Sequence, residues 1–223
     1  MIDQEWCIKV PSAKFEAMRG DERFHQVLAL GRMLNSLRFL QSTFLGAADL
    51  KPPGDFRHRL NAFFFIVAVL YEGLLLLERM GKHFRGKSIW QQRIVPILRD
   101  GTFDRLSSAS MHPLRNRAVF HFFEDALKET LAGCDPKDFT VVSGSGRGQK
   151  EVFYELSDLL ALDLFIGKSD STEEQTRRAI RLMDQTLDLL KNIVDASESL
   201  IEEYCKSEGM IFEEVSEGKS GAA

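Results

Sequence analysis

One short stretch, from Pro113 to His121, has residue types suited to binding an anion. Proline is favoured at the first position of a helix, where its missing N–H costs no hydrogen bond, so we expect a helix to begin at Pro113. Arg115 and Asn116 would then lie in the first turn, beside unpaired backbone donors and the positive end of the helix dipole. Arg117 and His121 are four residues apart and would share one face of that helix. The stretch therefore predicts a phosphate-binding site near a helix end.

The same residues could also cleave a phosphodiester. An imidazole with an ordinary pKa of about 6.5 gains and loses a proton near neutral pH, which makes His121 the candidate acid–base group. RNA cleavage by its own 2′-hydroxyl needs a base for that hydroxyl and cations for the charge on the phosphate. The planar fork of Arg115 binds two oxygen atoms at once, and Asn116 would orient the imidazole or the phosphate. Arg117 and Lys128, on the polar side of the same predicted helix, are further candidate phosphate contacts.

The order of Arg115, Asn116 and His121, an Arg-Asn pair followed after a few residues by a histidine, resembles the signature of the HEPN superfamily of small all-helical proteins. Many HEPN proteins are metal-independent RNA endonucleases of toxin–antitoxin, phage-defence or RNA-processing systems, and others are non-catalytic binding or dimerisation modules. The resemblance implies a homodimer in which the helices that carry this motif, the motif helices, meet and form a composite RNA-cleaving site. It also implies no cofactor, and an antitoxin or other partner protein. In antitoxin-modified relatives a tyrosine follows the histidine by two positions. Phe123 stands there in this chain, so that form of control is not expected.

A structural interpretation of the motif helix remains open. Arg117, His121, Glu124 and Lys128 form a polar stripe, and such a stripe is commonly a solvated face with local ion pairs. Catalysis would require Arg115 and His121 to lie in a groove at a two-fold interface, whereas a structural role would place them on a convex surface. The alternative function is therefore a non-catalytic helical module that binds RNA, a nucleotide or a protein partner, or that dimerises.

Composition indicates a soluble globular protein of one domain, because 44% of the 223 residues are apolar and 28% are charged. The net charge of −4 leaves no general basic excess, so any contact with RNA must be a local patch. The cysteines, Cys7, Cys134 and Cys205, are widely spaced and include no Cys-x-x-Cys pair. This argues against a disulfide framework or a zinc knuckle, and together with the lack of a signal-peptide pattern it predicts a cytoplasmic protein.

The apolar stretch from Leu60 to Leu77 is the segment that most resembles a membrane span. Asn61, Glu72 and Gly73 interrupt it, which leaves an unbroken run of about ten residues, whereas a span needs roughly twenty. We therefore expect the central helix of a bundle, apolar nearly all round, and no contact with a membrane.

Hydrophobic periodicity predicts an all-α chain in its first half. After irregular residues 1–20, two long helices are expected, from Asp21 to about Ala48 and from about Asp55 to Phe84. Shorter helices at 88–99 and 102–109 would precede the motif helix, which we expect to run from Pro113 to about Ala132.

The second half is expected to complete a HEPN-like helical bundle. A small β-hairpin is predicted near 139–154 around a glycine-rich tip, followed by a helix over 156–166. Ser171 and Glu174 have the spacing of a capping box, which would open a long C-terminal helix to about Cys205. One domain over residues 1–206 and a disordered tail over 207–223 follow from this pattern.

Two further groups of residues have types and spacings that could form a binding site. Glu22-x-x-His25 and Asp55-x-x-His58 have the carboxylate–histidine spacing of di-iron bundles. Both lie near the starts of consecutive helices, which would be at opposite ends of an antiparallel pair, so no metal site is predicted. The cluster of Arg177, Arg178 and Arg181 near the start of the last helix is a secondary candidate for contact with a phosphate backbone.

Overall fold

The computed structural model describes most of the chain in separate stretches. They are residues 5–46, 54–119, 124–132, 143–144, 152–153, 155–167 and 171–215. Helices hold the great majority of these residues, and the strands are short. The all-α fold class predicted from the sequence is therefore confirmed.

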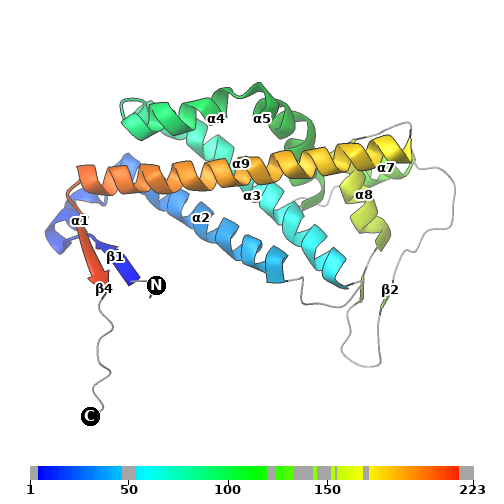
Figure 1. The fold of residues 1–223 in the computed structure, drawn as a ribbon. Helices are drawn as coiled ribbons and strands as arrows, with labels where there is room; N and C mark the ends of the chain where they lie inside the picture. The colour runs from blue at the N-terminus through cyan, green and yellow to red at the C-terminus, as the bar shows by residue number, and fades with distance from the viewer. Residues whose placement is uncertain are drawn as a thin grey trace, which may run out of the picture.

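Three long helices form the frame of the bundle, and their bounds are Glu22–Gly46 for α2, Gly54–Phe84 for α3 and Thr172–Ser207 for α9. α2 and α3 are consecutive in the chain and pack against each other, and α9 crosses both (Figure 1). The sequence predicted all three helices at nearly these bounds, from the apolar residues of α2 and α3 and from the capping residues at the start of α9.

The contact between α2 and α3 is close because a glycine lies in it. A β-carbon at Gly73 would overlap the sulfur atom of Met33, so a larger residue would have to displace that side chain. Near one end of the pair, Nε2 of His83 lies 3.2 Å from Oε2 of Glu22. The start of α2 therefore adjoins the end of α3, and the two helices are antiparallel.

Helix α3 is the central helix of this bundle. It is the one helix in the described part of the chain that is long and apolar enough to cross a membrane, but 61% of its most apolar window is buried inside the molecule. Phe63, Phe84 and Leu77 are among its fully buried side chains, and Phe63 packs edge-on against Phe165 with ring centroids 5.4 Å apart. The apolar run that resembled a membrane span thus supplies the core of the protein.

A series of short helical segments follows α3 along one side of the bundle. In chain order they are η2 (Trp90–Ile94), α4 (Val95–Arg99), α5 (Gly101–Leu106), η3 (Ser107–Met111), α6 (His112–Leu114) and η4 (Arg115–Val119), the η segments being π-helical. The predicted start of a helix at Pro113 is wrong, because the backbone is helical without interruption from Gly101 to Val119. Leu106, Met111 and Arg115, at the junctions between segments, all have α-helical backbone angles.

The π-helical segments explain how two prolines are accommodated within helical backbone, Pro113 in this helix and Pro96 in α4. Proline lacks the N–H of the ordinary helical bond, and its ring clashes with the carbonyl four residues earlier. For Pro113 that carbonyl belongs to Ala109 in η3, and for Pro96 it belongs to Gln92 in η2. A π-helical turn widens the backbone by one residue at this position, so the helix continues where the sequence suggested a beginning.

The first described strand pairs with the last. β1 (Glu5–Lys9) and β4 (Ile211–Val215) form an antiparallel two-stranded sheet in which Cys7 is opposite Glu213. The short helix α1 (Ser12–Met18) follows β1. Residues 5–18 are therefore not irregular, and the prediction of a disordered tail is wrong for residues 207–215. The domain extends beyond the predicted boundary at residue 206, since β4 completes this sheet.

A glycine turns the chain from α9 into β4. Gly209 has a φ of 62°, in the left-handed region where glycine is favoured. The N–H groups of Gly209 and Met210 donate to the carbonyl oxygens of Lys206 and Cys205 at 3.0 Å each, which closes the helix end. Met210 is buried, so the turn also fixes the start of β4 against the core.

The hairpin and the capping residue predicted before α9 are both present. β2 (Ser143–Gly144) pairs antiparallel with β3 (Val152–Phe153), within the predicted range of 139–154. Helix α8 follows at Glu155–Ile166. The hydroxyl of Ser171 accepts a hydrogen bond from the N–H of Glu174 at 3.1 Å and caps the first turn of α9.

Candidate functional site

Arg115 lies where η4 packs against α3. Its Nη2 atom is 2.5 Å from Oε1 of Glu72, and the side chain of Arg115 is 25% exposed whereas that of Glu72 is 41% exposed. The preceding residue, Leu114, is fully buried and holds this part of the helix against the core. The arginine is therefore at the rim of the bundle, half-buried and paired with a carboxylate.

Asn116 completes this arrangement from the same segment. Its Oδ1 accepts a hydrogen bond from Nη1 of Arg115. The guanidinium thus contacts two oxygen acceptors, one from a carboxylate on α3 and one from an amide on η4. The sequence predicted that Arg115 and Asn116 act together, and the structure brings them together.

The prediction that this pair lies in the first turn of a helix is wrong. Arg115 and Asn116 do not lie at a helix N-terminus, since the helix begins well before them at Gly101. The N–H of Arg115 donates to the carbonyl oxygen of His112, so it is engaged within the helix. Neither free backbone donors nor the positive end of a helix dipole is therefore available to an anion here, and side chains would have to bind it.

The other predicted phosphate contacts lie on η4 and on α7, which spans Glu124–Leu131. Arg117 forms an ion pair with Glu129 of α7, with 2.6 Å between Nη2 and Oε2. Lys128 is exposed on α7. Arg117 therefore links η4 to α7, and a phosphate would have to compete with Glu129 for its guanidinium.

His121, the predicted acid–base residue, lies outside the described residues, as does Phe123. The part of the motif that the structure describes is thus Arg115, Asn116 and Arg117 on one side of this position and Lys128 on the other.

A second imidazole, His112, lies beside Arg115 and was missed from the sequence. His112 is exposed, and its ring meets that of Tyr71 on α3 edge-to-face, with centroids 5.5 Å apart and an interplanar angle of 62°. His112 and Arg115 contact consecutive residues of α3, Tyr71 and Glu72, and so face the same helix. The sequence did contain a signal for this pair, because His112 and Arg115 are three residues apart and this spacing places two side chains on one face of a helix.

The carboxylate–histidine pairs of α2 and α3 do not come together. Glu22 lies near His83 at the end of α3, whereas Asp55 and His58 belong to the opposite end of that helix. Nε2 of His25 is 2.7 Å from the carbonyl oxygen of Arg19, so the ring is engaged locally. Across the residues that the structure places, no three His, Cys, Asp or Glu side chains are grouped as a metal site.

The arginine cluster of α9 is partly paired. Arg177 lies 3.3 Å from Glu173 (Nη2 to Oε1), one turn earlier on the exposed start of the helix. The guanidinium of Arg178 lies close to Gly167, where a β-carbon would be 3.1 Å from its Nη2. Arg181 is exposed. This surface carries less free positive charge than its sequence suggests.

Comparison of the chain with protein-family models, with curated proteins and with solved structures finds no match.

Proposed function

We propose that this protein is a HEPN-like, metal-independent endoribonuclease that binds the RNA phosphate at Arg115. The observation that supports the proposal is the pairing of Arg115 with Glu72 and Asn116. The fork of Arg115 already holds a carboxylate, and a phosphate presents a similar pair of oxygen atoms to a guanidinium. The phosphate would replace Glu72 on this fork.

The chemistry assigned to this site is an internal transfer. The imidazole of His121 takes the proton of the 2′-hydroxyl, and the 2′-oxygen attacks the phosphorus atom. Arg115 stabilises the added negative charge on the phosphate oxygens. The bond to the 5′-oxygen breaks, and that oxygen takes a proton from an imidazolium. His112, three residues before Arg115 on the same helix, is a second imidazole for this step. The products are a 2′,3′-cyclic phosphate and a 5′-hydroxyl.

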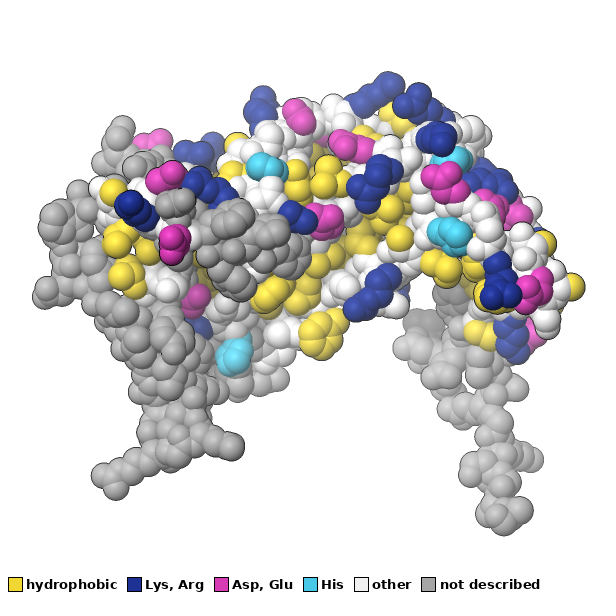
Figure 2. Space-filling view, turned by 180° about the vertical axis from the view of Figure 1, so that it is seen from behind, with side chains coloured by type: hydrophobic (Ala, Val, Ile, Leu, Met, Phe, Trp, Pro, Cys, Tyr) yellow, Lys and Arg dark blue, Asp and Glu magenta, His cyan; other side chains and the backbone are white. Residues whose placement is uncertain are grey.

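The HEPN resemblance supplies the biological part of the proposal. It suggests a homodimer that pairs two motif helices, a cytoplasmic toxin or phage-defence effector, and an antitoxin or other partner protein. Figure 2 shows a broad apolar strip through the middle of one face, with Lys and Arg interspersed with acidic side chains around it. Exposed apolar surface of this kind is typical of protein contacts, and local basic groups agree with contact to a limited length of RNA.

A ribonuclease assay in the presence of a chelator tests the proposal. We expect the wild type to cleave RNA and to leave cyclic phosphate ends, and we expect Arg115→Ala and His121→Ala to lose about a hundredfold or more in rate. Arg93→Ala, an exposed arginine on another segment, is the matched control and should cleave normally. Cleavage that disappears with the chelator and returns with a divalent metal, or that survives His121→Ala, would overturn the mechanism.

A non-catalytic helical module is the second candidate function, and the ion pairs favour it. Arg115 is paired with Glu72 and Arg117 with Glu129, as they would be if these arginines only joined helices. A protein of this class would show no cleavage in the same assay, and Arg115→Ala would lower its melting temperature without changing any activity on RNA.

A further inference from the structure

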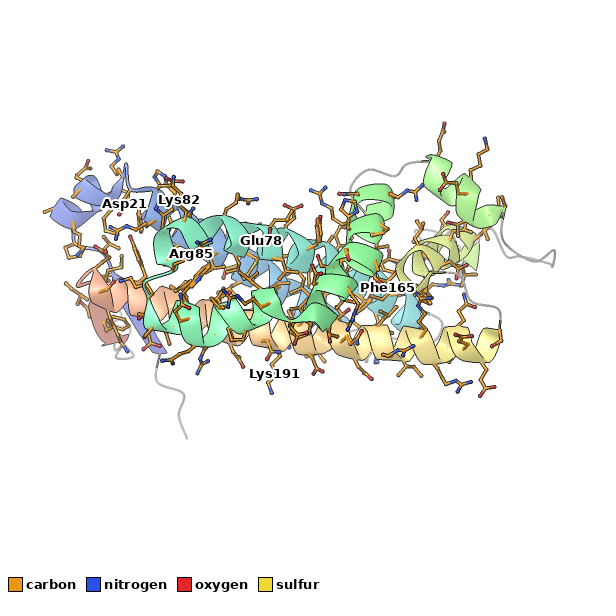
Figure 3. All side chains as sticks on the ribbon, turned by 90° about the horizontal axis from the view of Figure 1, so that it is seen from above. Asp21, Glu78, Lys82, Arg85, Phe165 and Lys191 are labelled. Carbon is orange, nitrogen blue, oxygen red and sulfur yellow. The ribbon has the colours of Figure 1, made fainter. Side chains whose placement is uncertain are left out.

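A pocket of 430 Å³ lies between the end of α3 and the segment formed by η2 and α4. This volume is within the range of about 300–1,000 Å³ that ligand pockets occupy. Residues from both elements line it, among them Gly81, Arg85, Trp90, Val95, Leu98 and Arg99. Figure 3 shows Glu78 on the last turns of α3, with Arg85 at the end that leads into this segment.

Trp90 and Gly81 shape the inner wall of the pocket. Trp90 is only 2% exposed, and its ring stacks on Phe84 with centroids 6.2 Å apart, so its position is fixed by the core. A β-carbon at Gly81 would lie 3.3 Å from the indole ring and 3.7 Å from Nε of Arg85. The absence of a side chain at Gly81 keeps the space open beside the indole and the arginine.

Two guanidinium groups reach this pocket from different elements. Arg85 follows the last residue of α3, and Arg99 is the last residue of α4. Neither side chain forms an ion pair or donates a hydrogen bond to any residue that the structure describes, unlike Arg115 and Arg117. Two positive charges beside one cavity repel each other, and an anion between them would remove that repulsion.

The remaining polar groups of the pocket are hydrogen-bond acceptors. Glu78 contributes a carboxylate. Nε2 of Gln91 donates to the carbonyl oxygen of Arg85 at 2.6 Å, which leaves the amide oxygen of Gln91 as an acceptor. Carboxylate and amide oxygens accept hydrogen bonds from hydroxyl groups. The apolar side chains of Val95 and Leu98 complete the wall.

We propose that this pocket binds a small phosphorylated metabolite that carries hydroxyl groups. Its phosphate lies between Arg85 and Arg99, its hydroxyl groups donate to Glu78 and Gln91, and its carbon skeleton lies against Val95 and Leu98. The proposal does not depend on the function assigned to Arg115, because the two sites share no residue.

Isothermal titration of the full chain tests this site with glucose 6-phosphate, a nucleoside monophosphate, inorganic phosphate and unphosphorylated glucose. We expect at least one of the two organic phosphates to bind with one site per chain, inorganic phosphate to bind more weakly, and glucose not to bind. Arg85→Ala and Arg99→Ala should each weaken binding about tenfold, since a hydrogen bond to a charged group contributes that much. Glu78→Ala should weaken binding of the organic phosphates, because it removes an acceptor for their hydroxyl groups, and should not weaken binding of inorganic phosphate.

Arg93→Ala is the control, because Arg93 lies on the same segment but lines a different pocket, beside Asp100 and Asp195. Its binding should equal that of the wild type. These arginines are exposed, so melting temperatures of the variants should stay near the wild-type value. Absence of saturable binding at millimolar concentrations of both organic phosphates would overturn the proposal. So would binding that persists in Arg85→Ala and Arg99→Ala, or binding of inorganic phosphate alone.

Discussion

The pairing of Arg115 with Glu72 decides how an anion could reach the candidate site. A carboxylate lies 2.5 Å from the guanidinium, so a phosphate must compete with a group that cannot diffuse away. Asn116 contacts the same guanidinium and limits its motion. Under the proposed function, the RNA affinity of this position therefore depends partly on the charge of a residue on α3.

Glu72→Gln tests this competition, since glutamine keeps the shape and removes the charge. We expect RNA to bind more tightly, by up to about tenfold, because the guanidinium is no longer neutralised. The free energy of unfolding should fall by only about 1 kcal/mol, as the pair is partly exposed. Fluorescence anisotropy with labelled RNA and urea denaturation measure the two effects. Glu129→Gln, which frees Arg117, is the comparison, and unchanged affinity in both variants would contradict phosphate binding by these arginines.

Tyr204 gives a second prediction at the level of one side chain. It is 1% exposed, and its hydroxyl has no hydrogen-bond partner among the residues that the structure resolves in detail. Burial, reinforced by the nearby carboxylates of Asp21 and Glu208, raises the pKa of Tyr204 to about 12. The folded state thus favours the neutral phenol. The stability that depends on a neutral Tyr204 is fully present below the ordinary pKa of about 10, and it is lost as the pH rises through 12.

Tyr204→Phe should therefore be neutral or stabilising at pH 7, by up to about 1–2 kcal/mol, because it removes a buried hydroxyl without a partner. Between pH 10 and 12 the variant should lose less stability than the wild type. Urea denaturation at pH 7 and at pH 11 measures the difference. A destabilisation of the variant at pH 7 would show that the hydroxyl makes a bond that this structure does not contain.

At the scale of the helix, the N-terminal cap of α9 contributes measurably to the free energy of unfolding. Ser171 accepts a hydrogen bond from the N–H of Glu174, whereas Ser199, within the same helix, bonds back to the carbonyl of Asp195. Ser171→Ala should lower the free energy of unfolding by about 1 kcal/mol. Ser199→Ala should be neutral or slightly stabilising, because a serine that bonds back to its own helix does not favour it. Urea denaturation that gave the same change for both variants would refute the role of the cap.

The long helices were predictable because their signals are local. The apolar repeat of α3 and the serine that begins α9 each lie within a few turns of sequence, and the structure confirms both elements. The prediction of a helix start at Pro113 was wrong because it also used a local signal. Proline commonly begins a helix, and only the π-helical turn before Pro113 allows the helix to continue. The strands β1 and β4 escaped prediction because each needs a partner at the far end of the chain.

The candidate site was predictable only in its sequence-local part. Arg115 and Asn116 are adjacent, so their contact follows from position alone. Glu72 and Tyr71 come from another helix, and no spacing in the sequence indicates that α3 would place them opposite Arg115 and His112. The charge that neutralises Arg115 is therefore a consequence of packing.

For the whole molecule, we expect an isologous two-fold dimer. One Arg-Asn-His set is a small constellation for phosphoryl chemistry, and the HEPN resemblance suggests that two motif helices meet. Large apolar side chains are also exposed, including Phe39 at 68%. Light scattering at tens of micromolar should give about twice the chain mass of 25.3 kDa. A mass of one chain would count against a composite site, while leaving the organic phosphate pocket unaffected.

The pairing of β1 with β4 has a consequence for the order in which the protein folds. During synthesis β1 emerges before the helices that the structure describes, yet its partner at Ile211–Val215 emerges only after them. The antiparallel pair of α2 and α3 is close in sequence and can form early, because few residues separate its helices. The sheet, in contrast, joins residues about 200 positions apart in the sequence, and it can form only when translation has passed residue 215. A strand that is synthesised before the described helices is thus among the last of the described elements to reach its native contacts.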